Sequence, residues 1–165
     1  MSCVDKLLTR RSIRKFKDTP IPDEVMQKIL EAGRQSPSAI NVQPWHFIVV
    51  TDQKLKDKLG NGLLNRMIRN SAFTLIGCYA PGNLFTKRYP PTDTAIAMQS
   101  MVLAAHLQGV GSCWLGDYNE NNIRKLFNVP NKIQILAVIA FGYPDEEPKP
   151  KKKKKMEEIF HYDKW

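Results

Sequence analysis

Hydrophobic positions recur at helical spacing in the first part of the chain. Residues 4–9 read as a short helix, and a stronger helix opens at Pro22 and Asp23 and ends near Gly33. The positions that share one face of this second helix are all apolar: Val25, Met26, Ile29 and Leu30. This spacing predicts an amphipathic helix that packs on a core.

Farther along, short apolar runs alternate with helical patterns. The runs predict four strands, at residues 45–51, 73–79, 112–116 and 133–143. The helices predicted among them cover residues 52–59, 92–108 and 119–127, and the middle one is apolar nearly all round, as expected of a buried central helix. Residues 35–44 and 81–91 lack periodicity and are predicted as loops. The alternation by itself favours a parallel sheet.

The chain changes character after Gly142. Prolines interrupt an acidic and then lysine-rich stretch, yet apolar residues return at the end: Ile159, Phe160, Tyr162 and Trp165. A disordered tail rarely keeps such side chains, so residues 144–165 predict an arm that docks on another surface. With 165 residues and 42% hydrophobic content, the sequence predicts one domain over residues 1–165.

The net charge of +9 raises the question of a nucleic-acid partner. Six lysines lie between Lys149 and Lys155 with no acid among them, so the rest of the chain carries only +3. Since no aromatic side chain is interleaved in this run, single-strand binding is disfavoured. A solubilising tail and a phosphate contact both remain open readings of the run.

The cysteines and the N-terminus indicate a cytoplasmic protein. Cys3, Cys78 and Cys113 are odd in number and widely separated, so neither a disulfide framework nor a zinc site is predicted. Asp5 and Lys6 stand where a signal peptide needs an apolar core, and no apolar run approaches the ~20 residues of a membrane span. We therefore expect reduced thiols and no membrane partner.

The first candidate for chemistry is the segment RRSIRKF, residues 10–16. It brings together Arg10, Arg11, Ser12 and Arg14. Guanidinium groups bind phosphate oxygens in a bidentate manner, and a serine adds a hydroxyl donor. Ile13 and Phe16 are interleaved as core contacts that would hold the segment against the body. The segment predicts a phosphate site, with a solvated basic turn as the alternative.

The second candidate is SPSAINVQPWHF, residues 36–47. The amides of Asn41 and Gln43 supply both donors and acceptors, which the N3–H, O2 and O4 of a flavin ring require. The alternative is an ordinary junction between loop and strand, with Trp45 in the core.

The third candidate, GVGSCWLG at residues 109–116, is not a dinucleotide fingerprint. Trp114 stands in place of the third glycine, and the segment enters a strand instead of leaving one. Its glycines suggest either a backbone approached by a flat ligand or a tight turn. Neither the three histidines nor any paired carboxylates have catalytic spacing. Phosphate contacts and amides without a catalytic side chain are typical of a cofactor-binding protein.

Four segments together resemble the FMN-dependent nitroreductase family, over almost the whole chain. They are RRSIRKF, SPSAINVQPWHF, DTAIAMQSMVLAAHLQGVGSCWLG and the C-terminal AFGYPDEEPKPKKKKKMEEIFHYDKW. The resemblance implies an α+β fold, a three-layer α-β-α sandwich with a mainly antiparallel mixed sheet, in place of the parallel sheet. It also implies a homodimer with an exchanged C-terminal arm.

The resemblance also implies a cofactor site. The residues matched to FMN are Arg10, Arg11, Ser12, Arg14, Pro37, Ser38, Asn41, Gln43, Trp114, Leu115, Gly116, Lys151 and Lys153. The arginine segment would hold the phosphate, ribityl chain and N1/O2 edge, and residues 37–41 would reach the partner subunit's flavin. The backbone of residues 115–116 would face N5 and O4, and the two lysines would close on the phosphate.

Two departures from the family pattern bear on this site. Ala39 stands where many relatives have serine. Lys153 stands where arginine is frequent, so a single ammonium charge replaces a planar, bidentate guanidinium group. The chain is also short between Thr51 and Pro91, where Asn65 and Arg69 are candidates for the ring edge.

The resemblance favours a homodimeric enzyme that passes a hydride from NAD(P)H through FMN to a small planar acceptor by a ping-pong cycle. The alternatives are a flavin carrier or sensor with little turnover, because the pocket region is short, and a nucleic-acid-binding module, because of the lysine run.

Overall fold

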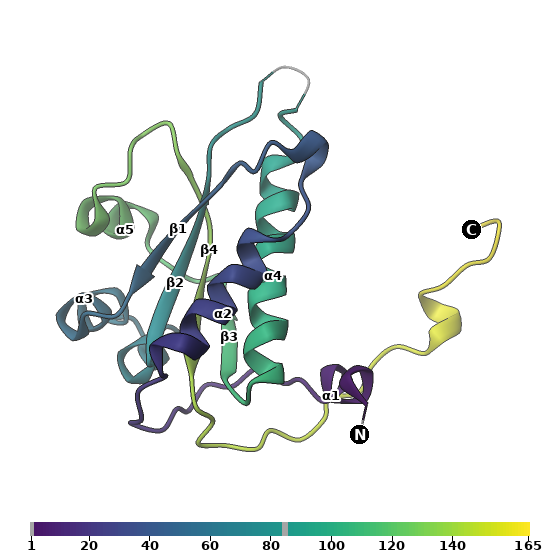
Figure 1. Cartoon of the computed structure of the whole chain (residues 1–165), viewed down its shortest axis with the longest axis horizontal. Helices are drawn as coiled ribbons and strands as arrows, with labels where there is room; N and C mark the ends of the chain where they lie inside the picture. Colours follow the sequence, from purple (N-terminus) through teal and green to yellow (C-terminus); the bar gives the residue numbers. More distant parts are fainter. Residues whose placement is uncertain (1, 84–85) are drawn as a thin grey trace.

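The computed structural model describes residues 2–83 and 86–165, and its centre is an antiparallel sheet (Figure 1). The strands are β1 (Trp45–Val50), β2 (Phe73–Tyr79), β3 (Gly111–Leu115) and β4 (Gln134–Gly142), in the order β1-β2-β4-β3. All three neighbouring pairs are antiparallel. The parallel sheet favoured by the alternation is wrong, because helix and strand alternate here without each helix carrying the chain back to the start of a parallel neighbour.

Helices cover both faces of this sheet. They are α1 (Cys3–Leu8), α2 (Asp23–Arg34), α3 (Gln53–Leu59), α4 (Pro90–Leu107) and α5 (Glu120–Phe127), with the 3-10 turns η1 (Ala39–Asn41), η2 (Arg66–Asn70) and η3 (Met156–Glu158). Side chains of α2 and α4 form one apolar cluster with the sheet, and those of α3, η2 and α5 form the other. Figure 1 shows the resulting layers. The three-layer α+β prediction is confirmed.

The central helix α4 packs unusually close to its neighbours. A Cβ atom at Gly33 of α2 would lie 2.0 Å from Cε of Met101, and one at Gly77 of β2 would lie 2.1 Å from Sδ of Met98. Both methionines are fully buried on α4. Glycine at these two positions therefore allows a buried helix to pack against both α2 and the sheet.

Boundaries differ from the prediction where proline stands at a helix start. The loop predicted over residues 81–91 includes residues 84 and 85, which lie outside the described part. Its last two residues belong to α4, which begins at Pro90 with prolines in its first turn. Proline fits there because the first helical N–H groups have no partner within the helix.

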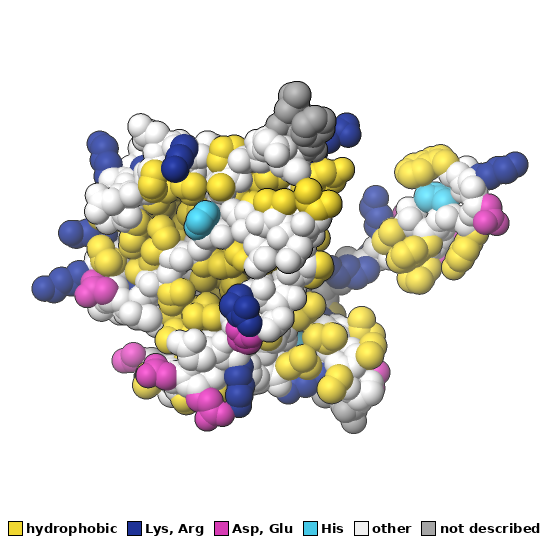
Figure 2. All heavy atoms as spheres, turned by 45° about the horizontal axis from the view of Figure 1, so that its top comes forward, with side chains coloured by type: hydrophobic (Ala, Val, Ile, Leu, Met, Phe, Trp, Pro, Cys, Tyr) yellow, Lys and Arg dark blue, Asp and Glu magenta, His cyan; other side chains and the backbone are white. Residues whose placement is uncertain are grey.

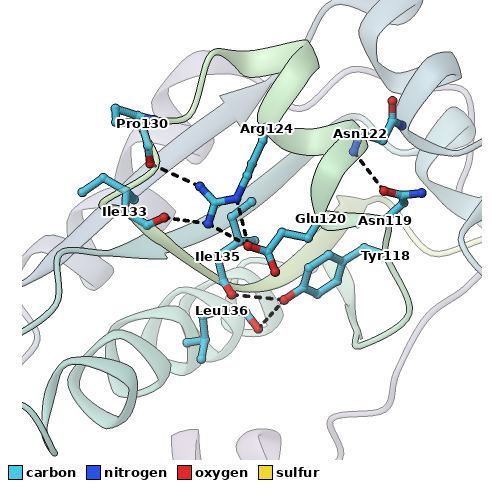
Figure 3. Close-up of polar contacts among 9 residues, drawn as sticks. All are labelled: Tyr118, Asn119, Glu120, Asn122, Arg124, Pro130, Ile133, Ile135 and Leu136. Atoms are coloured by element: carbon cyan, nitrogen blue, oxygen red, sulfur yellow. Dashed lines mark hydrogen bonds and ion pairs between the residues drawn. The ribbon is translucent and has the colours of Figure 1, made fainter.

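The connection from β3 to β4 is held by side chains on α5 and just before it (Figure 3). Nη2 of Arg124 lies 2.7 Å from Oε1 of Glu120 and donates to the carbonyl of Ile133 at 2.9 Å. The hydroxyl of Tyr118 donates to the carbonyl of Leu136 at 3.0 Å. These bonds fix the chain that follows the end of β3.

Beyond residue 150 the C-terminal arm leaves the body of the protein (Figure 1). Every residue from 151 to 165 is exposed. Figure 2 shows the arm's hydrophobic side chains gathered away from the body, and they are Met156, Ile159, Phe160, Tyr162 and Trp165. The structure therefore shows an arm with exposed apolar side chains, and the surface on which it docks stays a prediction.

Candidate functional site

The arginine segment is held in place by backbone hydrogen bonds. Ser12 forms a parallel bridge with Ser112 of β3, and the N–H of Ile13 donates to the carbonyl of Ser112 at 3.0 Å. At the other end, Lys17 donates to the carbonyl of Tyr143 at 2.9 Å. Ile13 and Phe16 are each only 7% exposed. The segment is therefore held against the body, as the interleaved Ile13 and Phe16 predicted, and its phosphate site stays a prediction.

Alternation along this extended segment separates its arginines. Arg11 donates to the carbonyl of Arg10 at 2.8 Å and lines a cavity beside His106. Arg14 lines a different cavity. Burial raises the pKa of Cys113, and the positive charges of Arg14 and Arg10 oppose that rise, so both lie near this thiol. The structure thus associates Arg10 with Arg14 and sets Arg11 apart from them.

The cavity at Arg14, which we call the Arg14 cavity, has a volume of about 880 Å³. Its lining comprises Arg14, Lys15, Phe16, Leu63, Leu64, Arg66, Met67, Arg69, Asn70, Asp145 and Glu146. The carboxylate of Glu146 accepts hydrogen bonds from the backbone N–H groups of Arg14 and Lys15, which fixes the cavity wall. A cavity of this size with apolar walls and several polar groups suits a planar cofactor or substrate.

The structure places Asn65 and Arg69, the two candidates for the edge of the flavin ring, in different surroundings. Asn65 is buried, accepting from the N–H of Gly62 at 2.8 Å and donating to the carbonyl of Leu59 at 3.2 Å. Arg69 donates from Nε to the carbonyl of Gly60 at 2.7 Å and lines the Arg14 cavity. Arg69 therefore faces the candidate site, whereas Asn65 stabilises its own loop.

The structure adds Leu63, Leu64, Arg66 and Met67, which sequence reasoning missed. Leu63 is 78% and Leu64 is 65% exposed, beside the break at Gly60–Gly62. An apolar pair next to a helix break is the signal that would have marked this wall in the sequence.

The amide loop, residues 36–44, has a constrained backbone. Ile40, Asn41 and Gln43 have φ angles of 45°, 58° and 51°, in the left-handed region. Such conformations, costly above all for a β-branched residue, cluster at functional sites. The N–H of Gln43 donates to Oγ of Ser38 at 2.9 Å, which holds the turn closed.

This loop and the arginine segment lie at opposite ends of α4 (Figure 1). The N–H of Ala39 donates to the carboxylate of Asp93 at 3.2 Å in the first turn of α4, whereas His106 near its end contacts Lys6, just before the arginines. Asp93 and His106 are separated by about 20 Å at 1.5 Å per residue. Within one chain the two predicted halves of the site do not converge.

At the end of β3 the three predicted residues point in different directions. The indole N–H of Trp114 donates to Gln99 of α4 at 3.3 Å, so the ring faces the helix. The side chain of Leu115 is buried in the opposite cluster. Gly116 is exposed, with open space where a Cβ would be. At Leu115 and Gly116, therefore, only backbone groups are open to a ligand.

The glycines before β3 have structural reasons. Gly109 has a φ of 80° in the turn after α4, and a Cβ at Gly111 would lie 2.7 Å from Cγ1 of Ile13. Gly111 thus allows the arginine segment to approach β3. Lys151 and Lys153 are exposed on the arm, and the phosphate clamp that they would form with the arginine segment stays a prediction.

The remaining candidate chemistry is confined to structural roles. Burial raises the pKa of Cys78 to about 11 and also raises that of Cys113, which disfavours reactive thiolates. His106 bonds to the carbonyl of Lys6 at 2.8 Å and joins α1 to α4. Over residues 2–83 and 86–165 no cluster of His, Cys, Asp or Glu is suited to hold a metal ion. Across those residues, too, no helix is long and apolar enough to cross a membrane.

The fold and this arrangement define a class of α+β proteins with a cofactor-sized cavity beside fixed arginines. The model of the nitroreductase family matches residues 7–81 and 82–143. The chain belongs to the nitroreductase family, whose members are oxidoreductases. The match ends at Tyr143, immediately before the arm.

Individual relatives agree with this assignment. A protein of Archaeoglobus fulgidus whose name includes the term NAD(P)H nitroreductase is 36% identical, over 88% of this chain and 87% of the relative. The NADPH-flavin oxidoreductase of Vibrio harveyi is 28% identical, over 90% of this chain and 68% of the relative. The structure of an FMN-dependent nitroreductase from Clostridium difficile R20291 is 28% identical, with a TM-score of 0.83, covering 98% of this chain and 99% of its own.

Proposed function

We propose that this protein is an FMN-dependent oxidoreductase that uses NAD(P)H to reduce a small planar acceptor such as a nitroaromatic or a quinone. Relatives with the same fold are named for FMN and for NADPH. The observation that carries the proposal is the arginine segment, which backbone bonds to Ser112 and Tyr143 fix beside the Arg14 cavity.

The residues present fit FMN. Arg10 and Arg14, whose charges both act on Cys113, and the hydroxyl of Ser12 are the donor set that a phosphate or an electron-rich ring edge requires. The cavity of about 880 Å³ combines three arginines with Leu63, Leu64 and Met67, which suits a flat ring with one polar edge. Lys151 and Lys153 would complete the phosphate contact.

Bound FMN would supply the redox chemistry, accepting a hydride from NAD(P)H and delivering it to the acceptor at the same pocket in turn. The protein's contribution is positioning and charge. The guanidinium of Arg14 would stabilise negative charge at the ring's N1/O2 edge, and the backbone of Leu115 and Gly116 would hold the opposite edge. The apolar pair Leu63 and Leu64 would exclude water from the cavity.

A homodimer would complete the site. Within one chain, Pro37, Ser38, Asn41 and Gln43 lie at the far end of α4, so they would contribute to the partner subunit's flavin. The amide of Asn41 is exposed at this end, beside Ile40, which is 86% exposed. The arm of residues 144–165 would cross to the partner and bury its apolar side chains there.

The test begins with the absorption spectrum of the purified protein and its anaerobic reduction. We expect a flavin spectrum, or reconstitution by added FMN, and bleaching by NADH or NADPH. Arg10→Ala should weaken FMN binding by about 1.5 to 3 kcal/mol, the range for hydrogen bonds to charged groups, as measured by fluorescence titration. Lys154→Ala, on the exposed arm, is the control and should change little. Equal losses for both variants would remove the specific role of the arginine segment, and a protein that does not bind FMN would refute the proposal.

A further inference from the structure

Lys56 on α3 is a buried cation without an ion-pair partner. Lys56 is only 6% exposed, and its Nζ donates to the carbonyl of Ser71 at 2.6 Å. None of the ion pairs formed within residues 2–83 and 86–165 includes it. Lysine is rarely buried unless it is paired, and an ammonium group has three N–H donors. The bond to Ser71 satisfies one of them.

Lys56 lines a second cavity, which has a volume of about 660 Å³. We call it the Lys56 cavity. Its lining comprises Phe16, Lys17, Asp18, Thr19, Pro20, Gln53, Lys56, Arg69, Asn70, Ser71 and Ala72. Three of these side chains are cationic and one is acidic. Arg69 uses Nε for the carbonyl of Gly60, which leaves its other N–H groups for a ligand.

The nearby carboxylates do not neutralise Lys56 directly. Asp52 caps α3 by accepting from the N–H of Leu55 at 2.9 Å, and Asp57 accepts from Gln53 at 2.8 Å. Asp18 lines the cavity. Burial lowers the pKa of Lys56, and the charges of Asp57, Asp18 and Asp52 oppose that effect. A bound anion would compensate the desolvated ammonium more fully than these three do.

We propose that the Lys56 cavity binds the carboxylate or phosphate group of a small molecule, at a site separate from the phosphate contact of the arginine segment. Lys56 and Lys17 supply positive charge, and Arg69 supplies a bidentate guanidinium group. Thr19 and Asn70 supply neutral hydrogen-bond donors. Because Arg69 and Asn70 line both cavities, the bound anion lies next to the Arg14 cavity. The inference does not depend on FMN, since the buried lysine and its cavity belong to the chain itself.

The experiment is a calorimetric titration of the FMN-saturated protein with inorganic phosphate and, separately, with acetate, against sodium chloride at equal ionic strength. We expect saturable binding of at least one of the two oxyanions. Preference for phosphate or for acetate identifies the group. Lys56→Met should weaken it by about tenfold or more, the loss of a charge-assisted hydrogen bond. Lys58→Met, an exposed lysine on the same helix, is the matched control and should retain it.

Two further variants keep the test decisive. If Lys56→Met does not fold, Asp18→Asn should tighten anion binding by roughly threefold or more, because it removes the acidic group from the lining. In flavin-free protein, the Arg10→Ala variant should bind the oxyanion with the same affinity as the unchanged protein. This result separates the Lys56 cavity from the arginine segment. The proposal is overturned if neither oxyanion binds more tightly than chloride. It is also overturned if Lys56→Met and Lys58→Met lose equal affinity for the oxyanion, or if Asp18→Asn leaves that affinity unchanged.

Discussion

The arginine segment and the C-terminal arm are two short basic segments with aromatic side chains, and the structure treats them in opposite ways. Phe16 in the first is 7% exposed and bridges to Pro144. In the arm, Phe160 is 53% and Trp165 is 102% exposed. Similar residue types thus give a fixed element near the N-terminus and an unsupported one at the C-terminus.

The difference arises from backbone partners. The arginine segment bonds to Ser112 and Tyr143, far along the chain, whereas the backbone bonds within residues 151–165 of the arm are local, such as that from Phe160 N–H to the carbonyl of Met156 at 2.9 Å. The start of the arm is bonded to the body, since Asp145 N–H donates to the carbonyl of Lys15, but the local bonds farther on do not place its apolar end on the body. An apolar surface shaped in this way is typical of a segment that binds another chain. The arginine segment should therefore contribute to the stability of the single chain and the arm to assembly.

Removal of the arm tests the second half of this comparison with the largest expected effect. A chain that ends at Lys155 loses Phe160 and Trp165, each worth about 1.5 to 3 kcal/mol when buried at an interface. We expect the dimer dissociation constant, measured by analytical ultracentrifugation, to rise about a thousandfold, since about 4 kcal/mol is lost. A double variant with alanine at Lys152 and Lys154 is the control and should remain dimeric. Dimers of undiminished affinity in the shortened chain would show that the arm does not hold the subunits together.

Truncation of one aromatic in each segment gives the next largest effect. Phe16→Ala should lower the free energy of unfolding by about 3 kcal/mol, because it leaves a cavity against Gly142, where Phe16 makes close contact. Phe160→Ala should lower it by less than about 0.5 kcal/mol in dilute, monomeric protein, because that ring is half exposed. Urea denaturation at two protein concentrations measures both. A similar loss in the two dilute variants would mean that the arm packs on its own chain.

The sequence predicted the elements well and their directions poorly. The four strands and the central helix were visible as apolar runs because burial imposes a periodicity on each element. Whether neighbours such as β2 and β4 run parallel depends on how the connections turn, and no local pattern encodes that. The resemblance corrected the sheet, since it carries topology that periodicity lacks.

For the candidate site, the residue types that could bind a cofactor were predictable from the sequence, but their arrangement in space was not. Ile13 and Phe16 indicated correctly that the arginine segment is held against the body. The segment is extended, so its side chains alternate and Arg11 is separated from Arg14. This could be inferred only once the bridge at Ser12 was known. The distance between the amide loop and the arginines, about the length of α4, is a property of the fold alone. Leu63 and Leu64 were missed because an exposed apolar pair gives no periodic signal.

Cysteine reactivity supplies the smallest and most local test of the comparison. Cys113 is 4% exposed and follows Gly111 and Ser112, which contact the arginine segment, whereas Cys3 is exposed. Burial raises the pKa of Cys113, so its thiolate fraction at pH 8.5 is lowered, and alkylation should be at least roughly tenfold slower than at Cys3. Mass spectrometry of alkylated peptides measures both rates, and the Cys113 rate should keep rising at higher pH.

Removal of the arm should leave the ratio of the two alkylation rates unchanged. Phe16→Ala should accelerate alkylation of Cys113, because the segment above β3 then opens more often. If arm removal accelerates Cys113 instead, the arm contributes to covering β3, and the division between a fixed segment and an assembling one does not hold.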